Sequence, residues 1–474
     1  LSTMFGRMPH REPRRATQEE FERLNRFPDG LDACGALRAE LAGSSLNRCS
    51  VLDPLDPEKQ LVQEKLLHGG FTVQESRAIA SLLGNVIGDS LGAPLEFSPV
   101  RYGSTELKDF GQQEVWSKPG YNSFGLKPGQ WTDDASMALC LADTLLVHQR
   151  LEPQDLRLRF LNWWAFGYNN AFGYDTASAR HGGSVGLGGN ISQSMSEFYR
   201  HRTPYTEAGD RYTSGNGSLM RNGPVPVFFA HEREAALDAA YKQSKTTHQG
   251  DEAAAACQLL THVVVAAINH ESREPAAIIA SVLGELGTSF TTDCYGVQCV
   301  ARSEQEQRCA ENKTSELADR NWNWKHAEYR YSPHRAAMQP GYIGSYAMDN
   351  IAMSLHCIWT TTSFTAALLK AANLRGDSDS VCAVVGQMAG AIYGVEAIPH
   401  HWIQLVQRWD NNGDVALKAW KLYHHSPLRA APAPAPAPAD ATNATDEAAT
   451  HEATTTATTT TMTPPAASAE SDTQ

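Results

Sequence analysis

The sequence predicts an all-α fold, and three observations support this prediction. Apolar residues recur at the helical spacing of i, i+3, i+4 and i+7 within 79–87, 137–145 and 381–392. Segment 253–268 is long, apolar and rich in alanine, as buried helices are. A convincing alternation of apolar and polar residues, which would indicate a strand, does not occur. We therefore expect a large helical domain with loops rich in glycine and acidic residues.

Composition divides the chain into three zones. Residues 1–70 are charged and weakly periodic, and we interpret them as an N-terminal extension of uncertain order. The helical domain is expected to span 71–425. Residues 429–474 are rich in Ala, Pro and Thr, so this tail lacks the apolar surface that would offset the entropy cost of ordering. We expect the tail to be disordered.

Charge and cysteine content exclude several functional classes. The chain has 474 residues with 40 Lys+Arg, 53 Asp+Glu and a net charge of −13, which argues against nucleic-acid binding. No run of 18 apolar residues and no secretory signal is found, so we expect a cytoplasmic monomer without a membrane contact. The nine cysteines include no CxxC pair, which indicates reduced thiols and no zinc site.

The first acidic turn is Thr132-Asp133-Asp134, at the start of a predicted helix. One interpretation is structural, because threonine is a good N-cap and acidic residues in the first turn suit the helix dipole. The other interpretation is a site for a hard cation, made of one hydroxyl and two carboxylates held close together. A cation at a helix N-terminus needs several carboxylates to outweigh the dipole.

The second acidic turn contains Asp377, Asp379 and Ser380, again at the start of an apolar helix. It is either a helix cap or part of a metal site. Mg²⁺ prefers about six oxygen ligands, whereas softer metals prefer His or Cys, which this turn lacks. The two acidic turns would form one binuclear site if the fold brought them together, which the sequence alone does not establish.

Three further segments carry candidate residues. Asp89 lies in a Gly-rich helix end and is interpreted as a buried cap, while Glu96 follows Pro94 and is either structural, a general acid/base or a ligand of a metal-bound water. The turn at 215–218 is either a plain turn or a loop whose backbone N–H groups bind a diphosphate. His248 is either a satisfied core residue or a catalytic group.

Taken in chain order, these segments resemble the ADP-ribosylglycohydrolase family, which includes the dinitrogenase reductase-activating glycohydrolase. The matching segments are GNVIGDSLGAPLEF, GQWTDDASMALCLADTLL, GNGSLMRNGPVPVF, TTHQGDEAAAA and NLRGDSDSVCAVVGQMAGAIYG. The resemblance covers about 72–400, and the polar stretch 292–338 is interpreted as an insertion within it.

The resemblance implies a bundled, orthogonally packed helical domain with a binuclear Mg²⁺ centre in a cleft, Mn²⁺ being an alternative. It implies metal ligation by both acidic turns, catalysis by Glu96 and Asp134, and substrate binding by the Gly-rich loop, by His248 and by Asp175 at the ribose. The implied metal ligands are Thr132, Asp133, Asp134, Asp377, Asp379 and Ser380, and the implied loop residues are Gly215, Asn216, Gly217 and Ser218.

The implied activity is hydrolysis of the bond from ribose C1 to a modified protein side chain, with arginine as the expected acceptor. The partner is then an ADP-ribosylated protein or a small molecule containing ADP-ribose. Serine-linked ADP-ribose, poly(ADP-ribose) and O-acetyl-ADP-ribose stay open as substrates. A catalytically inactive, ADP-ribose-binding or structural relative is the alternative from another class. All acids of both turns are present, which favours the enzyme.

Overall fold

The structure is a computed structural model that describes residues 51–53, 55–172, 184–309 and 315–428. These residues form α-helices joined by loops, short 3₁₀ turns and one π-helical turn at 279–283, and within them we find no β-sheet, only two isolated β-bridges. The all-α prediction is therefore confirmed. The predicted disordered tail, 429–474, lies outside the described residues.

The predicted apolar stripes each fall within a helix of the structure. Segment 79–87 lies in α4, 137–145 in α6, 253–268 in α11 and 381–392 in α18. The helices are α3 Pro57–His68, α4 Val73–Gly92, α5 Gln113–Trp116, α6 Asp133–His148, α7 Pro153–Phe166, α8 Gly189–His201, α9 Pro224–Phe228, α10 Arg233–Lys245, α11 Asp251–Ile268, α12 Pro275–Ile278, α13 Leu286–Ser289, α14 Tyr295–Arg302, α15 Pro333–Met338, α16 Ala347–Trp359, α17 Phe364–Leu374, α18 Ser378–Tyr393, α19 His400–Gln407 and α20 Asp414–His424. The short turns of helix are η2 Ala93–Leu95, η3 Asn216–Ser218, η4 Ile279–Leu283, η5 Gln307–Cys309, η6 Glu316–Asp319, η7 Pro340–Tyr342 and η8 Val395–Ala397.

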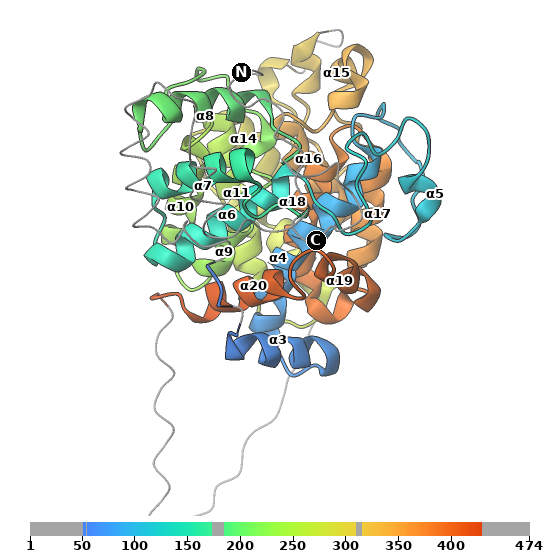
Figure 1. Cartoon of the computed structure of the whole chain (residues 1–474). Coiled ribbons are helices and arrows are strands. Elements are labelled where there is room, and N and C mark those ends of the chain that lie inside the picture. Colours follow the sequence, from blue (N-terminus) through green and yellow to red (C-terminus); the bar gives the residue numbers. More distant parts are fainter. Residues whose placement is uncertain (1–50, 54, 173–183, 310–314, 429–474) are drawn as a thin grey trace, which may run out of the picture. The chain divides into compact units, whose positions relative to one another are not determined.

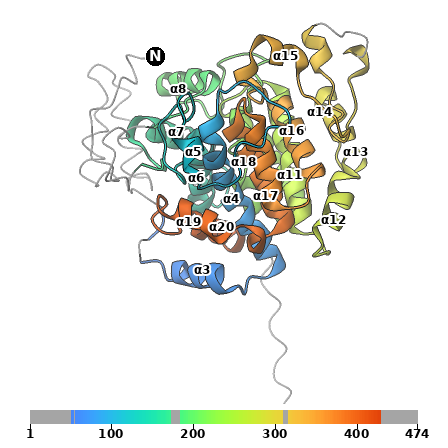
Figure 2. The same cartoon turned by 90° about the vertical axis from the view of Figure 1, so that its right-hand side faces the viewer.

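Helices α4 and α18 form the centre of the core and pack against each other along their whole length (Figures 1 and 2). Glycines on both helices make this close approach possible. A Cβ on Gly84, Gly88 or Gly92 would overlap backbone atoms of α18 at residues 386, 382 and 378. The numbering runs in opposite directions, so the helices are antiparallel. The C-terminal end of α4 therefore lies beside the N-terminal end of α18.

This packing gives a stability prediction. We expect Gly88→Ala to lower the free energy of unfolding by about 1–3 kcal/mol or more, because the added methyl overlaps the carbonyl of Cys382 and neither helix backbone can move without cost. Thermal unfolding measures the effect. Gly189→Ala is the matched control, since nothing lies within 4 Å of the position that its methyl would take. Equal unfolding temperatures for the two variants would contradict the packing.

Helices α4 and α11 are long and apolar enough to cross a membrane by composition alone. In the structure their apolar windows are 100% and 78% buried, respectively. Both contact α18, and α11 also packs against α10 and α16 (Figure 2). Their apolar character is accounted for by burial in the helical core.

Part of the predicted N-terminal extension is helical. Helix α3 begins after Asp56, whose side chain accepts a hydrogen bond from the N–H of Glu58. Lys59 forms an ion pair with Asp414 at 2.9 Å, and Glu58 forms one with Lys421 at 2.6 Å. These contacts attach α3 to the last described helix, α20. Residues 1–50 lie outside the described part of the chain.

Candidate active site

The two acidic turns meet at one cavity. It has a volume of about 540 Å³ and lies where η2, α6, α18 and η3 end or begin. The turns come together because α4 and α18 are antiparallel and α6 packs against both. Its lining residues are Glu96, Phe97, Phe124, Asp133, Gly186, Leu187, Gly188, Gly189, Asn190, Ile191, Gly215, Asn216, Gly217, Met220, His248, Tyr342, Ser345, Asp377, Asp379 and Ser380.

Carboxylates form two groups at this cavity, and the groups share Asp379. One contains Asp89, Asp134 and Asp379, and the other contains Glu96, Asp377 and Asp379. Within each group, one oxygen per residue lies within 4.8 Å of the others. We call these five residues, together with Asp133 on the cavity wall, the carboxylate cluster. Two oxygen-rich groups with a common member have the donor chemistry for two hard divalent cations.

Burial and mutual repulsion raise the pKa values of Asp89, Glu96, Asp134 and Asp379. Desolvation, followed by the charge of Asp379, raises the pKa of Asp89 to about 7. The same two causes, desolvation first and neighbouring carboxylates second, hold the pKa values of Glu96, Asp134 and Asp379 well above the ordinary range. Like charges crowded into a dry site are stable only when protonated or neutralised by a cation.

Two oxygen atoms of the cluster show that the residues fit a cation. Oε2 of Glu96 and Oδ1 of Asp134 are buried, and neither finds a hydrogen-bond partner among the described residues. A buried carboxylate oxygen without a donor carries a desolvation cost that a bound metal removes. The donors present are all oxygen, which suits Mg²⁺ or Mn²⁺ better than zinc or copper.

A pH-dependent measurement follows from the raised pKa values. Binding of a divalent cation should displace protons from the cluster, so the affinity for Mg²⁺ should rise as the pH increases through the Asp89 pKa of about 7. Calorimetric titration in two buffers of different ionisation enthalpy measures the protons released. Binding heats that are identical in both buffers at pH 6 would contradict this expectation, because no proton would then leave.

The capping interpretation of Thr132 is wrong in one respect. Thr132 is the N-cap residue of α6, but its side chain makes no capping bond. Asp89 takes that role from α4, accepting hydrogen bonds from the N–H groups of Thr132 at 2.9 Å and Ala135 at 2.8 Å. The Thr132 hydroxyl donates to Asp89 at 2.9 Å and lies 3.3 Å from both Asp134 and Asp379. The sequence identified Asp89 as a cap but missed its membership of a carboxylate group.

The remaining predicted ligands lie at the cavity wall. Asp133 faces the backbone of Gly186, which leaves no room for a side chain at that position. Ser380 lines the cavity, and its hydroxyl lies 3.6 Å from the sulfur of Met220. Metal ligation by Asp133 and Ser380, as by the other four predicted ligands, stays a prediction. Asp175 lies outside the described residues.

The Gly-rich loop lines the cavity beside the carboxylate cluster and is fixed to Asp377. The Asn216 amide donates to Asp377 and to the carbonyl of Gly344, both at 3.0 Å, and the Asn216 N–H donates to the carbonyl of Ser345 at 2.8 Å. Gly215 and Gly217 line the cavity. Ser218 does not, because its hydroxyl is buried against Ser244 at 2.7 Å. Only the first three residues of the predicted loop therefore face a ligand.

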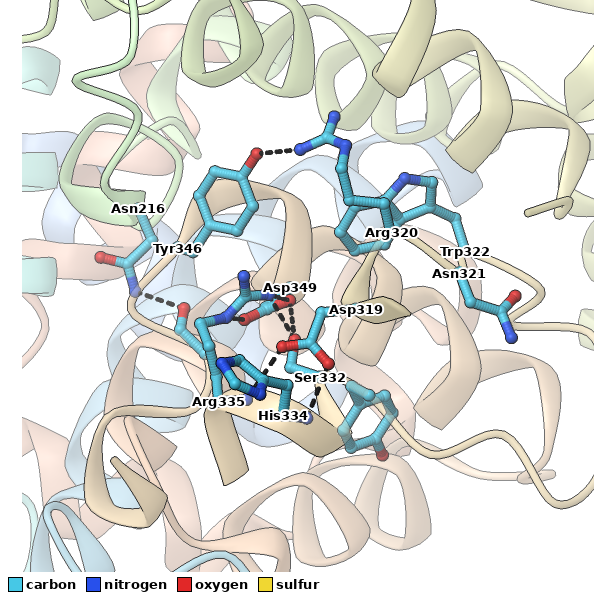
Figure 3. A network of polar contacts seen from close by, with 12 residues as sticks. Asn216, Asp319, Arg320, Asn321, Trp322, Ser332, His334, Arg335, Tyr346 and Asp349 are labelled. Carbon is cyan, nitrogen blue, oxygen red and sulfur yellow. Dashed lines mark hydrogen bonds and ion pairs between the residues drawn. The ribbon is translucent and has the colours of Figure 1, made fainter. Parts of the chain in front are cut away.

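The insertion at 292–338 supports this wall through Tyr346 (Figure 3). Tyr346 forms a β-bridge with Gly215, and its hydroxyl contacts Arg320 at 2.9 Å and Glu252. Arg320 also forms an ion pair with Glu306. The insertion, which the sequence left without a role, thus positions the segment that carries Ser345 and Tyr346 beside the Gly-rich loop.

His248 is buried behind Gly215 and Gly217, with Nε2 toward both glycines. Desolvation, followed by the charge of Arg221, lowers the pKa of His248 to about 3, so the imidazole is neutral. The hydroxyl of Thr247 lies 2.8 Å from Nδ1 and accepts a hydrogen bond from Arg221 at 2.8 Å. Among the described residues Nδ1 is the only acceptor in reach of the Thr247 hydroxyl proton. We therefore expect the His248 proton on Nε2, facing the cavity.

This tautomer is testable by nitrogen-15 NMR of His248. Wild-type protein should show a protonated Nε2, and Thr247→Val should move the proton to Nδ1 or give a mixture of tautomers, because the donor to Nδ1 is lost. Thr247→Ser retains the hydroxyl and should behave as wild type. An unchanged tautomer in Thr247→Val would contradict the assignment.

Comparison with known proteins places this geometry in a family. A family model described as ADP-ribosylglycohydrolase matches residues 72–429. The chain belongs to the ADP-ribosylglycohydrolase family. The family match contains the whole carboxylate cluster, the Gly-rich loop and His248, and it begins after α3. The resemblance inferred from the five motifs is thereby confirmed.

Several relatives within the family are hydrolases by name. The chain is 29% identical over 351 residues to ADP-ribosylarginine hydrolase Tri1 of Pseudomonas putida (strain GB-1), covering 74% of this chain and 79% of the relative. It is 25% identical to the ADP-ribosyl-[dinitrogen reductase] glycohydrolase of Rhodospirillum rubrum, covering 69% and 89% of the two chains. A solved structure, described as an ADP-ribosylglycohydrolase-related protein complex, matches with a TM-score of 0.52 and 27% identity, covering 74% of this chain and 99% of the other.

Proposed function

We propose that this ADP-ribosylglycohydrolase is a Mg²⁺-dependent hydrolase that removes ADP-ribose from arginine side chains of proteins. The observation that carries the proposal is the pair of carboxylate groups sharing Asp379, next to a Gly-rich loop that lines the same cavity. Relatives named ADP-ribosylarginine hydrolase support arginine as the acceptor. Hydrolase chemistry on ADP-ribosyl groups agrees with the family as a whole.

In this proposal, different residues of the cavity bind different parts of the substrate. The N–H groups around Gly215 and Gly217 and the expected Nε2–H of His248 would donate to the diphosphate, since they are the donors on that wall. Two Mg²⁺ ions, held by Asp89, Asp134, Asp377 and Asp379, would supply charge that holds the ribose diol and lowers the pKa of a water molecule.

Glu96 is the proton carrier in this proposal. The carbon–nitrogen bond from ribose C1 to the guanidine breaks, a water oxygen forms the new bond to C1, and the guanidine leaves with one proton. Glu96 Oε2, buried and without a hydrogen-bond partner among the described residues, is placed to take the water proton or to hand one to the leaving nitrogen. The transition state carries positive charge on the sugar, which the surrounding carboxylates stabilise.

One assay tests the proposed function. The protein is incubated with arginine-linked and serine-linked ADP-ribosyl peptides, in Mg²⁺ and in EDTA, and free ADP-ribose is measured. Release from the arginine-linked peptide in Mg²⁺ but not in EDTA is the expected result. Release from the serine-linked peptide alone would show that the substrate is serine-linked ADP-ribose and not arginine-linked ADP-ribose. Tight binding of ADP-ribose without release from any substrate, including poly(ADP-ribose) and O-acetyl-ADP-ribose, would indicate the inactive relative.

A further inference from the structure

Three aromatic side chains surround the mouth of the cavity beside the carboxylate cluster. We call Phe97, Phe124 and Tyr342 the aromatic rim. The ring of Phe97 lies 5.7 Å from that of Tyr342 and 6.1 Å from that of Phe124, measured between centroids. Phe97 and Tyr342 are 41% and 59% exposed, and all three residues line the cavity. Large apolar rings kept in contact with water at a cavity mouth are typical of a binding surface.

The backbone holds Phe97 at the rim against its own preference. Its φ of +61° is in the left-handed region, which a bulky side chain enters at a cost of about 1 kcal/mol or more. The Phe97 N–H donates to the carbonyl of Gly376 at 2.9 Å, so the residue is attached directly before Asp377. Phe97 therefore lies between two members of the carboxylate cluster, Glu96 and Asp377. A strained backbone at this position indicates that the ring of Phe97 has a function there.

The position of the rim defines which part of a substrate it meets. Phe97 follows Glu96 in the chain, and its backbone packs against Gly341, next to Tyr342. The reacting ribose carbon lies at the carboxylates in the proposed function, and the Gly-rich loop takes the diphosphate. The Gly-rich loop reaches the cluster at Asp377, through the Asn216 amide at 3.0 Å, whereas the rim follows directly after Glu96, the proposed proton carrier to the leaving nitrogen. The rim therefore meets the acceptor side of the scissile bond.

Charge selects the acceptor. Among the residues that the structure describes, four carboxylates line the cavity and no Lys or Arg does. Two divalent ions would leave the six ionised carboxylates of the cluster with excess negative charge, before the substrate diphosphate is added. A planar cation over aromatic faces, beside this negative field, is stabilised both by the rings and by the cluster. A neutral seryl side chain would be stabilised neither by the rings nor by the negative charge of the cluster.

We propose that the aromatic rim is the acceptor subsite and that it stacks the cationic guanidinium of an ADP-ribosylated arginine. The inference rests on the proposed function and extends it, because it assigns the choice between arginine and serine to Phe97, Phe124 and Tyr342. The rings act on the acceptor and not on the proton transfer, so they determine affinity for the arginine-linked substrate more than the rate of bond cleavage.

The test compares Tyr342→Leu with Tyr342→Phe. Tyr342 is exposed, so both variants should fold, and only the leucine variant removes the ring. We expect KM for an arginine-linked peptide to rise about 3- to 30-fold in Tyr342→Leu combined with Phe97→Leu, with a smaller rise for Tyr342→Leu alone and little change in Tyr342→Phe. The Kd for free ADP-ribose should stay at its wild-type value in all variants.

Two results would overturn the inference. Equal KM values for Tyr342→Leu and Tyr342→Phe would show that the ring has no part in acceptor binding. A Kd for ADP-ribose that weakens as much as KM rises would show that the rim holds the adenine instead. Phe97→Asn adds an independent check, since asparagine tolerates the left-handed backbone. We expect that variant to unfold at a higher temperature while its KM rises.

A binding experiment separates this inference from the proposed function. Methylguanidinium and the neutral methylurea are titrated by NMR into protein loaded with Mg²⁺ and ADP-ribose. The wild type should prefer methylguanidinium, and the doubly substituted leucine variant should lose that preference. If wild-type protein shows this preference but hydrolyses no arginine-linked peptide, the proposed function fails and the rim assignment stands. If the wild type binds both probes equally, the rim assignment fails.

Discussion

Asp379→Asn is expected to lower kcat by about 10³-fold or more, a greater loss than Asp134→Ala or Asp377→Ala should cause. Asp379 belongs to both carboxylate groups, so its loss weakens both proposed cation sites at once. A loss of this size corresponds to about 4 kcal/mol of transition-state stabilisation, within the several kcal/mol that a metal ion supplies. Asp134→Ala and Asp377→Ala, which each remove one carboxylate from a single group, should also abolish most activity without unfolding the domain.

Stability distinguishes a lost site from a lost fold. Asp379 is buried among carboxylates that raise its pKa, so replacing it by a neutral amide removes repulsion in the metal-free protein. Asp379→Asn should therefore unfold at the same temperature as wild type or higher in EDTA, and should gain less from added Mg²⁺. Asp410→Asn, another buried aspartate outside the cavity, is the control and should keep full activity. A fully active Asp379→Asn protein would refute the role of Asp379.

Glu96→Gln is expected to lower kcat by about 10²- to 10⁴-fold while leaving affinity for ADP-ribose within a few-fold of wild type. The amide keeps the size of the side chain but neither takes nor gives a proton, and general acid–base help contributes a factor of this order. Calorimetric binding of ADP-ribose in Mg²⁺ and single-turnover hydrolysis separate binding from chemistry.

The control for this prediction is Glu58→Gln, which breaks an ion pair with Lys421. Neither residue lines the cavity. It should alter stability slightly and leave hydrolysis unchanged. If Glu96→Gln lost ADP-ribose binding in parallel with kcat, Glu96 would act in binding and the proton-carrier role would be wrong.

Much of the fold was predictable because helical periodicity is local. The stripes at 79–87, 137–145 and 381–392 lie in helices, and the Ala-rich segment 253–268 lies in α11. The sequence also placed both acidic turns at the starts of helices, as the structure has them.

The meeting of the acidic turns was not predictable from local pattern. It depends on the backbone contact of α4 with α18 through residues such as Gly88, which the sequence shows only as small residues. For the same reason the sequence presented Asp89 as a cap alone. The side chain of Ser218 is directed into the core by its hydrogen bond with Ser244, and Ser244 belongs to no motif that the sequence shows. The rim residues Phe124 and Tyr342 lie in segments without strong periodicity, so nothing local connects them to Phe97.

The proposed function depends on two acidic turns, distant in the sequence, holding a pair of divalent ions in one cavity. Anomalous diffraction from crystals grown with Mn²⁺ tests this dependence without an activity assay. We expect two peaks, one within the group of Asp89 and Asp134 and one within the group of Glu96 and Asp377, with Asp379 between them. The absence of a peak at the carboxylate cluster would contradict the proposed metal centre, whether or not Mn²⁺ is bound elsewhere in the crystal.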